Sequence, residues 1–413
     1  MKNIFILLIA LFATKNTTAQ WISQLSGNSF AELKSVYFIN ENIGYAVGYN
    51  TIGYSGVLLK TTDGGANWIT QWSSPAPGTQ LIKVFFTDTN TGYIVGQVNS
   101  IKVILKTTDG GTNWSSQTTG DILYSLYFID ANTGYAVGVG GKILKTTDAG
   151  TTWITQTSPT SFTLLSVFFI DANTGYATGR EMGTGTNNGP IIKTTNGGTN
   201  WTSIGFSGNG EFSSLYFTDA NTGYVVGDNA VILKTTNGGT NWTAQTSGIT
   251  NILKSVYFTD VNTGYIVGGN GTILKTTNGG NSWFSQISNT TYNLSSVCFA
   301  NANTGYIVGG TTVYPTNYNI ILKTTNSGGP SGIEGFEKNN NITIYPNPVN
   351  DKIEITELDN GMIEIINIQG QIVKTLNTSN TKTTIDLSKL SSGVYTMRIK
   401  TDDGIMIKKI IKQ

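Results

Sequence analysis

Carboxylate side chains are the residues of this sequence that could do acid–base chemistry. The 413-residue chain has 24 Asp and Glu residues but no His. The absence of His removes the usual proton shuttle at neutral pH, the Ser-His-Asp triad and nearly all zinc sites. Two carboxylates across a cleft could still cleave a glycosidic bond. Asp121, Glu181, Glu211 and Asp228 are eligible, but no pattern pairs them and loop acids are ordinarily solvated. We therefore predict no catalytic residue, no metal ligand and no cofactor.

A second candidate for chemistry is the segment Asp-Ala-Asn-Thr-Gly, which occurs at 130–134, 171–175 and 219–223. Its alternating oxygen ligands match the start of a calcium-binding loop. The third acid is missing, however, and the twelfth position counted from Asp130 is Gly141 instead of Glu. Asp, Asn and Gly are the ordinary residues of tight turns. The segment therefore predicts a hairpin turn.

The third candidate is a Gly-rich segment such as ILKTTDGGTNW at 104–114, which recurs along the chain. Its Asp or Asn can accept hydrogen bonds from backbone NH groups, and its Gly residues can adopt positive φ. Catalysis needs one asymmetric site, whereas this segment is present in seven copies. We interpret it as a structural turn whose acidic or amide residue is Asp63, Asp109, Asp148, Asn196, Asn237, Asn278 or Asn326.

These segments belong to a repeat that contains one Gly-Tyr pair per copy. The pairs begin at Gly44, Gly92, Gly134, Gly175, Gly223, Gly264 and Gly305, and so recur every 41 to 48 residues. Every segment of the repeat alternates apolar and polar residues, which favours one four-stranded propeller blade over a helical repeat. We name the expected strands A (LxSVxF), B (GYxVG), C (ILKTT) and D (from Trp). Cys298 replaces an aromatic residue of strand A, and we interpret it as a small strand residue.

The last repeat has no strand D after residues 321–330, but the missing sequence lies at the other end of the chain. Residues 21–27, WISQLSG, match strand D of other repeats, such as WTAQTSG at 242–248. We therefore predict an all-β fold: a seven-bladed β-propeller closed by this N-terminal strand, without an exposed edge. The Lys residues of strand C, Lys60 among them, are expected to be solvated.

The C-to-D turn resembles the Asp-box of sialidase-like and sortilin-like propellers, because Thr61, Asp63, Gly65 and Trp68 match its pattern. In those families the box is structural and lies opposite the functional face. A sialidase also clamps its substrate with three Arg residues, whereas this propeller has Arg180 alone. A xyloglucanase-type Asp-box enzyme would need only the loop acids. The resemblance therefore leaves an extracellular glycoside hydrolase as the alternative function.

The longer pattern VGxxGxILKTTDGGxxW, seen at 137–153 and 267–283, resembles propellers related to the photosystem II stability and assembly factor. Those factors are non-catalytic protein-binding scaffolds that use an Arg-rich patch. This chain lacks that patch, so a photosystem role does not follow. The resemblance implies a binding or scaffold propeller.

The C-terminal segment changes character after a Gly-rich, polar stretch, and its alternating runs indicate a small Ig-like β-sandwich. It resembles the type A sorting domain that the type IX secretion machinery of Bacteroidetes recognises. The residues that carry this resemblance are Pro346, Asn347, Pro348, Gly370, Gly393, Tyr395, Lys408 and Lys409. The resemblance implies the secretion machinery as a partner, and a protein that passes through the periplasm to be secreted or held at the outer cell surface.

The expected domain boundaries follow from these patterns. Residues 1–19 have Lys2, a short apolar run and Ala19, which is typical of a cleaved signal peptide. The propeller is expected at 20–327, a linker at 328–341 and the sorting domain at 342–413. With 25 Lys and Arg residues against 24 Asp and Glu residues, the chain has no strong net charge that would attract nucleic acid. No apolar segment after residue 19 is long enough to span a membrane. We expect a monomer.

The expected ligand surface is the face formed by the B-to-C connections. The turns of the opposite face are nearly identical among repeats, whereas the B-to-C segments 49–56, 97–102, 180–190 and 311–318 are insertions. Insertions on one face of a repeat protein often form its binding surface. We predict that this face binds a protein or polysaccharide through Arg180, Glu181, Tyr49, Tyr54, Tyr314 and Tyr318.

Overall fold

The structure is a computed structural model that divides into two compact units, Met1–Ser331 and Gly332–Gln413. It describes residues 21–26, 31–50, 55–73, 77–181, 189–204, 210–311, 318–328, 343–356, 358, 361–367, 371–378, 381–401 and 404–413. Among these residues, no helix is long and apolar enough to cross a membrane. The predicted signal peptide lies outside the described residues, and so does the predicted linker except for its first residue, Gly328.

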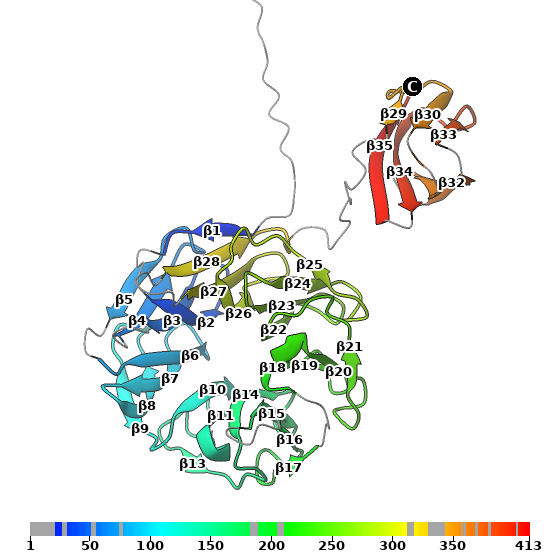
Figure 1. Cartoon of the computed structure of the whole chain (residues 1–413). Helices are drawn as coiled ribbons and strands as arrows, with labels where there is room; N and C mark the ends of the chain where they lie inside the picture. The colour runs from blue at the N-terminus through cyan, green and yellow to red at the C-terminus, as the bar shows by residue number, and fades with distance from the viewer. Residues whose placement is uncertain are drawn as a thin grey trace, which may run out of the picture. The chain divides into compact units, whose positions relative to one another are not determined.

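The described part of the first unit contains seven four-stranded antiparallel sheets, each a blade, arranged in a ring (Figure 1). Blades 1 to 4 consist of β2 Glu32–Phe38, β3 Gly44–Asn50, β4 Ser55–Thr61 and β5 Ile69–Ser73; β6 Gln80–Phe86, β7 Gly92–Val98, β8 Ile101–Thr107 and β9 Ser115–Thr118; β10 Leu123–Phe128, β11 Gly134–Gly138, β12 Ile143–Thr146 and β13 Ile154–Thr155; and β14 Thr163–Phe169, β15 Gly175–Arg180, β16 Ile191–Thr194 and β17 Thr202–Ser203.

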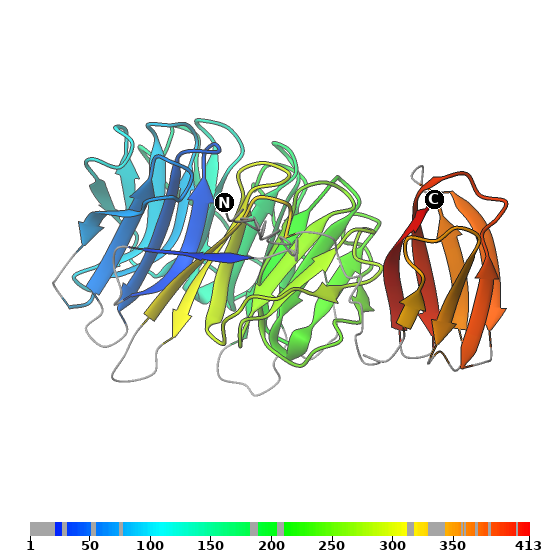
Figure 2. The ribbon, with the colours of Figure 1, turned by 90° about the horizontal axis from the view of Figure 1, so that it is seen from above.

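Blades 5 to 7 complete the ring. They consist of β18 Phe212–Phe217, β19 Gly223–Gly227, β20 Ile232–Thr235 and β21 Thr243–Gln245; β22 Leu253–Phe258, β23 Gly264–Gly268, β24 Ile273–Thr276 and β25 Phe284–Ser285; and β26 Asn293–Phe299, β27 Gly305–Thr311, β28 Tyr318–Thr324 and β1 Ile22–Gln24. Short 3-10 turns, η1 Val139–Gly141 and η2 Asp228–Ala230, join strands B and C in blades 3 and 5. Figure 2 shows the ring edge on, with the strands running between its two faces.

The predicted closure by the N-terminal strand is confirmed. Strand β1 pairs antiparallel with β28, with Ile22 opposite Lys323 and Gln24 opposite Ile321. Trp21, which is 1% exposed, packs edge-on against Phe299 at a centroid distance of 6.0 Å. The ring is closed because the two ends of the propeller sequence complete one sheet, which leaves no unpaired strand at the seam.

Aromatic side chains hold neighbouring blades together. At the seam between the last and first blades, Phe38 stacks on Tyr306 at a centroid distance of 3.6 Å, and Trp68 meets Phe38 edge-on at 5.8 Å. Equivalent Phe–Tyr stacks recur between the other blades, for example Phe86 on Tyr45. Each buried aromatic ring removes a large apolar surface from water, so the blade interfaces are also the core of the propeller.

Every inner strand, the strand A of its blade, has a register shift near its start. In β2 the shift lies between Leu33 and Ser35, so Lys34 is the extra residue. The same shift occurs in the other six inner strands, as between Leu81 and Lys83 in β6. A bulge of this kind turns an extra side chain away from the regular alternation, and here it adds a side chain per blade that can face the ring's centre.

The insertion at 97–102 is a longer hairpin and not an irregular loop. Strands β7 and β8 extend to Val98 and from Ile101, and the two residues between them have positive φ, 50° at Asn99 and 66° at Ser100. Two such residues form the turn whose twist matches a two-stranded hairpin. The predicted insertion therefore becomes an extension of the blade toward one face.

The second unit is a β-sandwich of two sheets, as predicted. Its strands are β29 Thr343–Tyr345, β30 Lys352–Thr356, β31 Gly361–Ile366, β32 Ile372–Thr378, β33 Lys382–Asp386, β34 Gly393–Thr401 and β35 Gly404–Lys412. One sheet has the order β29-β30-β33 and the other β32-β31-β34-β35. Between them lies an aliphatic core that includes Ile353, Ile363, Met397 and Ile399.

Candidate functional site

The C-to-D turns of the propeller are organised by hydrogen bonds within each turn. Thr61 Oγ1 donates to Asp63 Oδ1 at 2.8 Å and accepts from the Gly65 NH at 2.8 Å, while the Asn67 NH donates to Asp63 Oδ1 at 2.9 Å. These bonds, first among them those from Asn67, lower the pKa of Asp63 to about 2. The carboxylate oxygens are occupied by the turn itself.

The same turn geometry is present in the other six copies. Asp109 and Asp148 accept equivalent bonds, and so do the amide oxygens of Asn196, Asn237 and Asn278; Asn326 accepts one from Thr324 Oγ1. Each turn also bonds to the A-to-B turn of its blade, since the Gly64 NH donates to the Asn42 carbonyl at 2.9 Å. The two kinds of turn therefore share one face of the ring.

The A-to-B segments form turns in the way the sequence predicts. Asp130 Oδ1 accepts bonds from the NH groups of Asn132 and Thr133, both at 2.7 Å. Asp171 and Asp219 accept the equivalent pairs. Among the described residues no group of three or more acidic or thiol side chains is placed to hold a metal ion.

The prediction that the strand C lysines are solvated was wrong. Lys60 Nζ donates to the Gly110 carbonyl of the next blade at 2.7 Å, and Lys275 is only 4% exposed. Four other strand C lysines donate the equivalent hydrogen bond to the next blade: Lys145, Lys193, Lys234 and Lys323. The remaining one, Lys106, lies over the ring of Tyr93. The sequence shows no partner for these lysines because the acceptor lies on the neighbouring blade.

The candidate site is a cavity of about 800 Å³ at the centre of the ring, to which all seven blades contribute. Its wall is made by the beginnings of strands A, as at Lys34, and by the ends of strands B, as at Arg180. Both lie at the end of the blade away from the Asp-box turns. The cavity, which we call the cup, is therefore on the face of the B-to-C and D-to-A connections.

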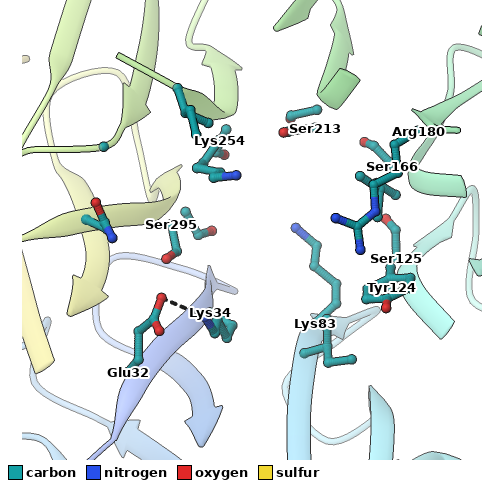
Figure 3. Close-up of a pocket in the computed structure, with 18 of the residues that line it drawn as sticks. Glu32, Lys34, Lys83, Tyr124, Ser125, Ser166, Arg180, Ser213, Lys254 and Ser295 are labelled. Atoms are coloured by element: carbon teal, nitrogen blue, oxygen red, sulfur yellow. Dashed lines mark ion pairs between the residues drawn. The ribbon is translucent and has the colours of Figure 1, made fainter. Parts of the chain in front are cut away.

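Four cationic side chains line the cup: Lys34, Lys83, Arg180 and Lys254. Figure 3 shows Lys83 and Arg180 extending into the space between its walls. Glu32 is the one acidic residue of the described lining, and it is paired with Lys34 at 2.6 Å. The cup is therefore positively charged, although the chain as a whole is nearly neutral.

The structure brings only two of the predicted contact residues into the cup, Tyr49 and Arg180. Glu181 follows Arg180 directly but is not part of the lining. Tyr318 is exposed at the start of β28 and stacks on Tyr292 with a centroid distance of 6.3 Å. Tyr54 and Tyr314 lie outside the described residues.

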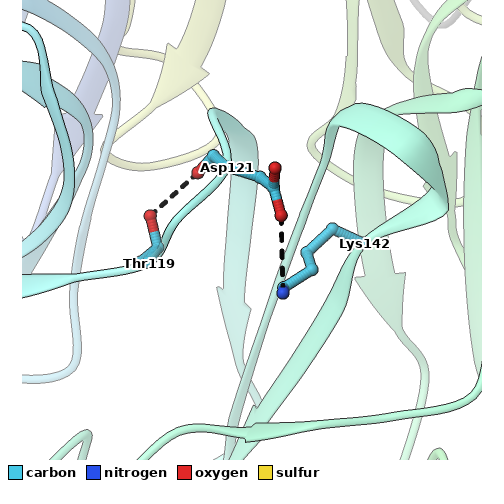
Figure 4. Close-up of polar contacts among 3 residues, drawn as sticks. All are labelled: Thr119, Asp121 and Lys142. Carbon is cyan, nitrogen blue, oxygen red and sulfur yellow. Dashed lines mark hydrogen bonds and ion pairs between the residues drawn. The ribbon is translucent and has the colours of Figure 1, made fainter.

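Two of the four loop acids that the sequence offers as candidate catalytic residues form ion pairs. Glu211 faces Arg180 with 3.7 Å between Oε2 and Nη1, and Asp121 faces Lys142 with 3.5 Å between Oδ2 and Nζ. Figure 4 shows that Thr119 also donates to the Asp121 carbonyl, at 2.8 Å. Asp228 opens the short turn η2. None of these four residues lines the cup.

Sequence reasoning missed the three lysines of the cup. Lys34 and Lys254 are the bulged residues of their strands, and the bulge cannot be read from an alternating pattern. Lys83 did leave a signal, because it stands where the other six strands A have Ser. A departure from a repeat consensus at an inward position is the observation that could have located the cup.

In the second unit, the residues of the predicted sorting signal lie around the end of the chain. Asn347 stands between Pro346 and Pro348 in the chain. Its Nδ2 donates to the Lys409 carbonyl at 2.7 Å, and its Oδ1 accepts from the Ile411 NH at 2.9 Å. Gly393 begins β34, Tyr395 Oη donates to the Ser391 carbonyl, and Lys408 and Lys409 are exposed on β35. Gly370 lies outside the described residues.

Comparisons with known proteins find similar proteins for both units. Residues 343–413 match the secretion system C-terminal sorting domain, and residues 13–123 match the photosynthesis system II assembly factor YCF48. The solved structure of YCF48 bound to D1 peptide is 19% identical, with a TM-score of 0.60, and the alignment covers 74% of this chain and 97% of that one. YCF48 from Cyanidioschyzon merolae is 18% identical, with a TM-score of 0.59 and coverage of 74% and 98%.

A third similar structure belongs to a surface protein. PorZ, a bacterial surface component of the type IX secretion system of Porphyromonas gingivalis, is 11% identical, with a TM-score of 0.54; the alignment covers 90% of this chain and 58% of PorZ. No curated protein matches the sequence at a significant level. The chain is thus a YCF48-like propeller followed by a type IX sorting domain. A protein with this sorting domain is exported by that system and reaches the cell surface or is secreted.

Proposed function

We propose that this exported protein is a non-catalytic binding propeller that recognises a protein or glycan ligand on the face of its B-to-C connections. The cup is the observation that carries the proposal. It is open, it is lined by all seven blades, and the bulged side chains of its wall differ from blade to blade, as Lys34, Tyr124 and Ser213 do. The opposite face consists of turns whose polar atoms bond to one another. A ligand that needs free polar groups finds them in the cup.

The alternative function, glycoside hydrolysis, requires two carboxyl groups that face each other across the bound sugar. The described lining of the cup has one, Glu32, and its carboxylate is paired with Lys34. Asp121 and Glu211 are paired with Lys142 and Arg180. These pairings favour charge-mediated binding over acid–base catalysis.

The similar proteins support the class of function and not its ligand. One YCF48 structure is described as bound to a D1 peptide, and PorZ is described as a surface component of a secretion system. Both descriptions are compatible with a propeller that binds a partner. Because these structures are under 20% identical to this chain, we infer the class of ligand from the side chains that line the cup.

We also propose that residues 20–327 are the functional propeller, that 328–341 are a linker and that 342–413 are the address for export. The two compact units, which divide near residue 331, support this organisation. The structural role proposed for the seven Asp-box residues is supported by their hydrogen bonds within the turns.

A screen of the chain from Gln20 to Gln413 against glycan and peptide arrays tests the binding function. We expect saturable binding without turnover, lost when the cup is filled by Ser295→Trp but retained in Glu211→Gln. Ser295 lines the cup and is partly exposed, so a larger side chain there has room to occupy the cavity. Product release that disappears in Glu211→Gln would instead establish the hydrolase. Binding that is unchanged in Ser295→Trp would show that the ligand does not bind in the cup.

A further inference from the structure

The charges of the cup are not balanced by its own side chains. Glu32 neutralises Lys34, and Glu211 lies near Arg180 from outside the lining. Among the described residues, Lys83 and Lys254 have no carboxylate partner within ion-pair distance. The Arg180 Nε is buried, and no described group accepts a hydrogen bond from it. The cup therefore holds cationic donors that an anion could satisfy.

Lys83 is the cation that the fold least requires. At the inward position that Lys83 occupies in its strand A, the strands A of the other six blades have Ser. Five of these Ser hydroxyls accept a hydrogen bond from a backbone NH of the following blade. The pairs are Ser35 with Val84, Ser166 with Leu215, Ser214 with Val256, Ser255 with Val297 and Ser296 with Val36, at 3.3 to 3.4 Å. A lysine ammonium cannot accept such a bond. Its presence costs the blade interface a contact, which points to a role in the cup.

The surroundings of Lys83 strengthen this point. Burial lowers the pKa of its ammonium group below the ordinary value. Lys83 is half-buried at the wall of the cup, and a bound anion would offset the hydration that its ammonium group has lost. Two residues further along each strand A is a position that is aromatic in most blades. These side chains form a ring of contacts that we call the collar, for example Phe85 beside Tyr37 at a centroid distance of 4.9 Å. No collar residue lines the cup, so the cavity ends at the serine level.

The remaining lining is rich in hydroxyl and amide groups. Asn270 donates from its side chain to Asn251 Oδ1 at 3.2 Å, and its NH donates to Asn293 Oδ1 at 3.3 Å. Ser213 and Ser295 add hydroxyls from the walls, as Figure 3 shows. Sites for drug-like molecules are mostly apolar, whereas this one offers many small polar groups. Such a surface suits a ligand that is itself covered with hydroxyl groups.

We infer that the cup binds an acidic sugar, a uronate residue of an oligosaccharide, whose carboxylate is held by Lys83 and Arg180 and whose hydroxyls bond to the Ser and Asn side chains. This inference rests on the proposed binding function and names its ligand class. The cavity volume of about 800 Å³ is in the range of small-ligand sites, so it admits a short chain end and not a folded partner.

Isothermal titration of the chain from Gln20 to Gln413 with trigalacturonate tests the inference. The fully methyl-esterified trisaccharide is the matched neutral probe, and tetraglutamate is the acidic peptide probe. We expect trigalacturonate to bind, and its ester to bind at least about tenfold more weakly, the ratio for one hydrogen bond to a charged group. Equal affinity for acid and ester would overturn the inference. Tighter binding of tetraglutamate would overturn the sugar assignment in favour of an acidic peptide.

Two lysine variants separate a specific site from general charge. Lys83→Ser installs the residue of the other six blades and should leave folding intact while weakening trigalacturonate about tenfold to about a hundredfold. Lys142→Ser removes the same charge outside the cup, where Lys142 pairs with Asp121, and should leave the affinity unchanged. Circular dichroism melting confirms that both variants are folded. Unchanged affinity in folded Lys83→Ser would refute the inference.

The Ser295→Trp variant distinguishes failure of this inference from failure of the binding function. If array ligands lose binding in Ser295→Trp but not in Lys83→Ser, the cup binds a ligand that is not held by this cation, and only the acidic-sugar assignment fails. If no array ligand depends on Ser295, the cup is not the binding site and both proposals fail.

Discussion

The hydroxyl of Tyr306 donates a 2.7 Å hydrogen bond to the carbonyl oxygen of Gly64, a residue 242 positions earlier in the chain. Lys323 Nζ donates to the same oxygen at 2.6 Å and lies 5.6 Å from the centroid of the Tyr306 ring. One buried carbonyl therefore receives two donors from the last blade. The equivalent tyrosine bond connects each of the other pairs of neighbouring blades, so this contact makes the seam resemble the other interfaces of the ring.

The shared acceptor predicts that the two donors are coupled in stability. Tyr306→Phe and Lys323→Met should each reduce the free energy of unfolding by about 0.5–1.5 kcal/mol, because the other donor remains. The double variant leaves the Gly64 oxygen unpaired, and should cost about 1–3 kcal/mol more than the sum of the single variants. Urea denaturation of the four proteins measures this coupling.

The chain contains its own control for this cycle. Tyr93 Oη donates to the Ala149 carbonyl at 2.7 Å, but within the described residues Lys106 makes no such bond. Tyr93→Phe and Lys106→Met should therefore combine additively. Additive behaviour at Tyr306 and Lys323 as well would show that the shared oxygen does not couple them.

Closure of the ring by Trp21 gives a second prediction. Trp21→Ala removes a side chain that is 1% exposed and that packs on Tyr265 and Phe299. It should reduce the free energy of unfolding by about 3–5 kcal/mol, as expected for a large-to-small change in a core. Trp72→Ala, at a half-buried Trp outside the repeat pattern, should cost less. Equal losses in thermal or urea unfolding would argue against a special role of the N-terminal strand.

The repeat pattern predicted this closure, because the missing strand of one repeat is present at the other end of the sequence. It did not predict the Lys60 contact with Gly110, since that bond joins residues 50 positions apart on different blades. Such contacts depend on how sheets are packed against each other, and alternation within a strand carries no information about that packing. The bulges that add Lys34 and Lys254 to the cup are hidden for the same reason.

The single thiol gives a third prediction. Burial raises the pKa of Cys298 to about 11, and the side chain is 7% exposed. Because the thiolate is the reactive form, little of it exists at pH 8. Ellman's reagent should therefore label the native protein very slowly and label one thiol promptly in guanidinium chloride. Prompt labelling of the native protein would show that Cys298 is accessible and reactive.

The Asp-box turns predict a dependence of stability on acid. Hydrogen bonds hold the pKa of Asp63, Asp109 and Asp148 at about 2, below the value of about 4 for an unfolded Asp. Because the folded pKa is lowered, this contribution is complete above about pH 4 and is lost as the pH falls to about 2. Replacing all three by Asn, the residue of the other four boxes, removes this dependence. The difference in stability between wild type and variant should thus shrink between pH 5 and pH 2 in urea titrations; parallel curves would contradict the turn geometry.

The sorting domain provides the last prediction, at Asn347. Its side chain bonds to the Lys409 carbonyl and the Ile411 NH, and next to it the backbone of Val349 bonds to Ile411 and Gln413. The side chain thus continues a pairing that Pro348, which has no NH, would interrupt. Asn347→Ala should loosen the end of the chain and speed hydrogen exchange of the Ile411 amide, whereas Asn377→Ala, at an exposed position, should not.

Export of the same two variants tests whether this contact matters for sorting. If the secretion machinery recognises the ordered end of β35, Asn347→Ala should accumulate in the periplasm while Asn377→Ala is exported normally. Faster exchange at Ile411 together with normal export would separate the structural role of Asn347 from recognition. Recognition would then depend on exposed side chains of β35, such as Lys408, Lys409 and Ile411.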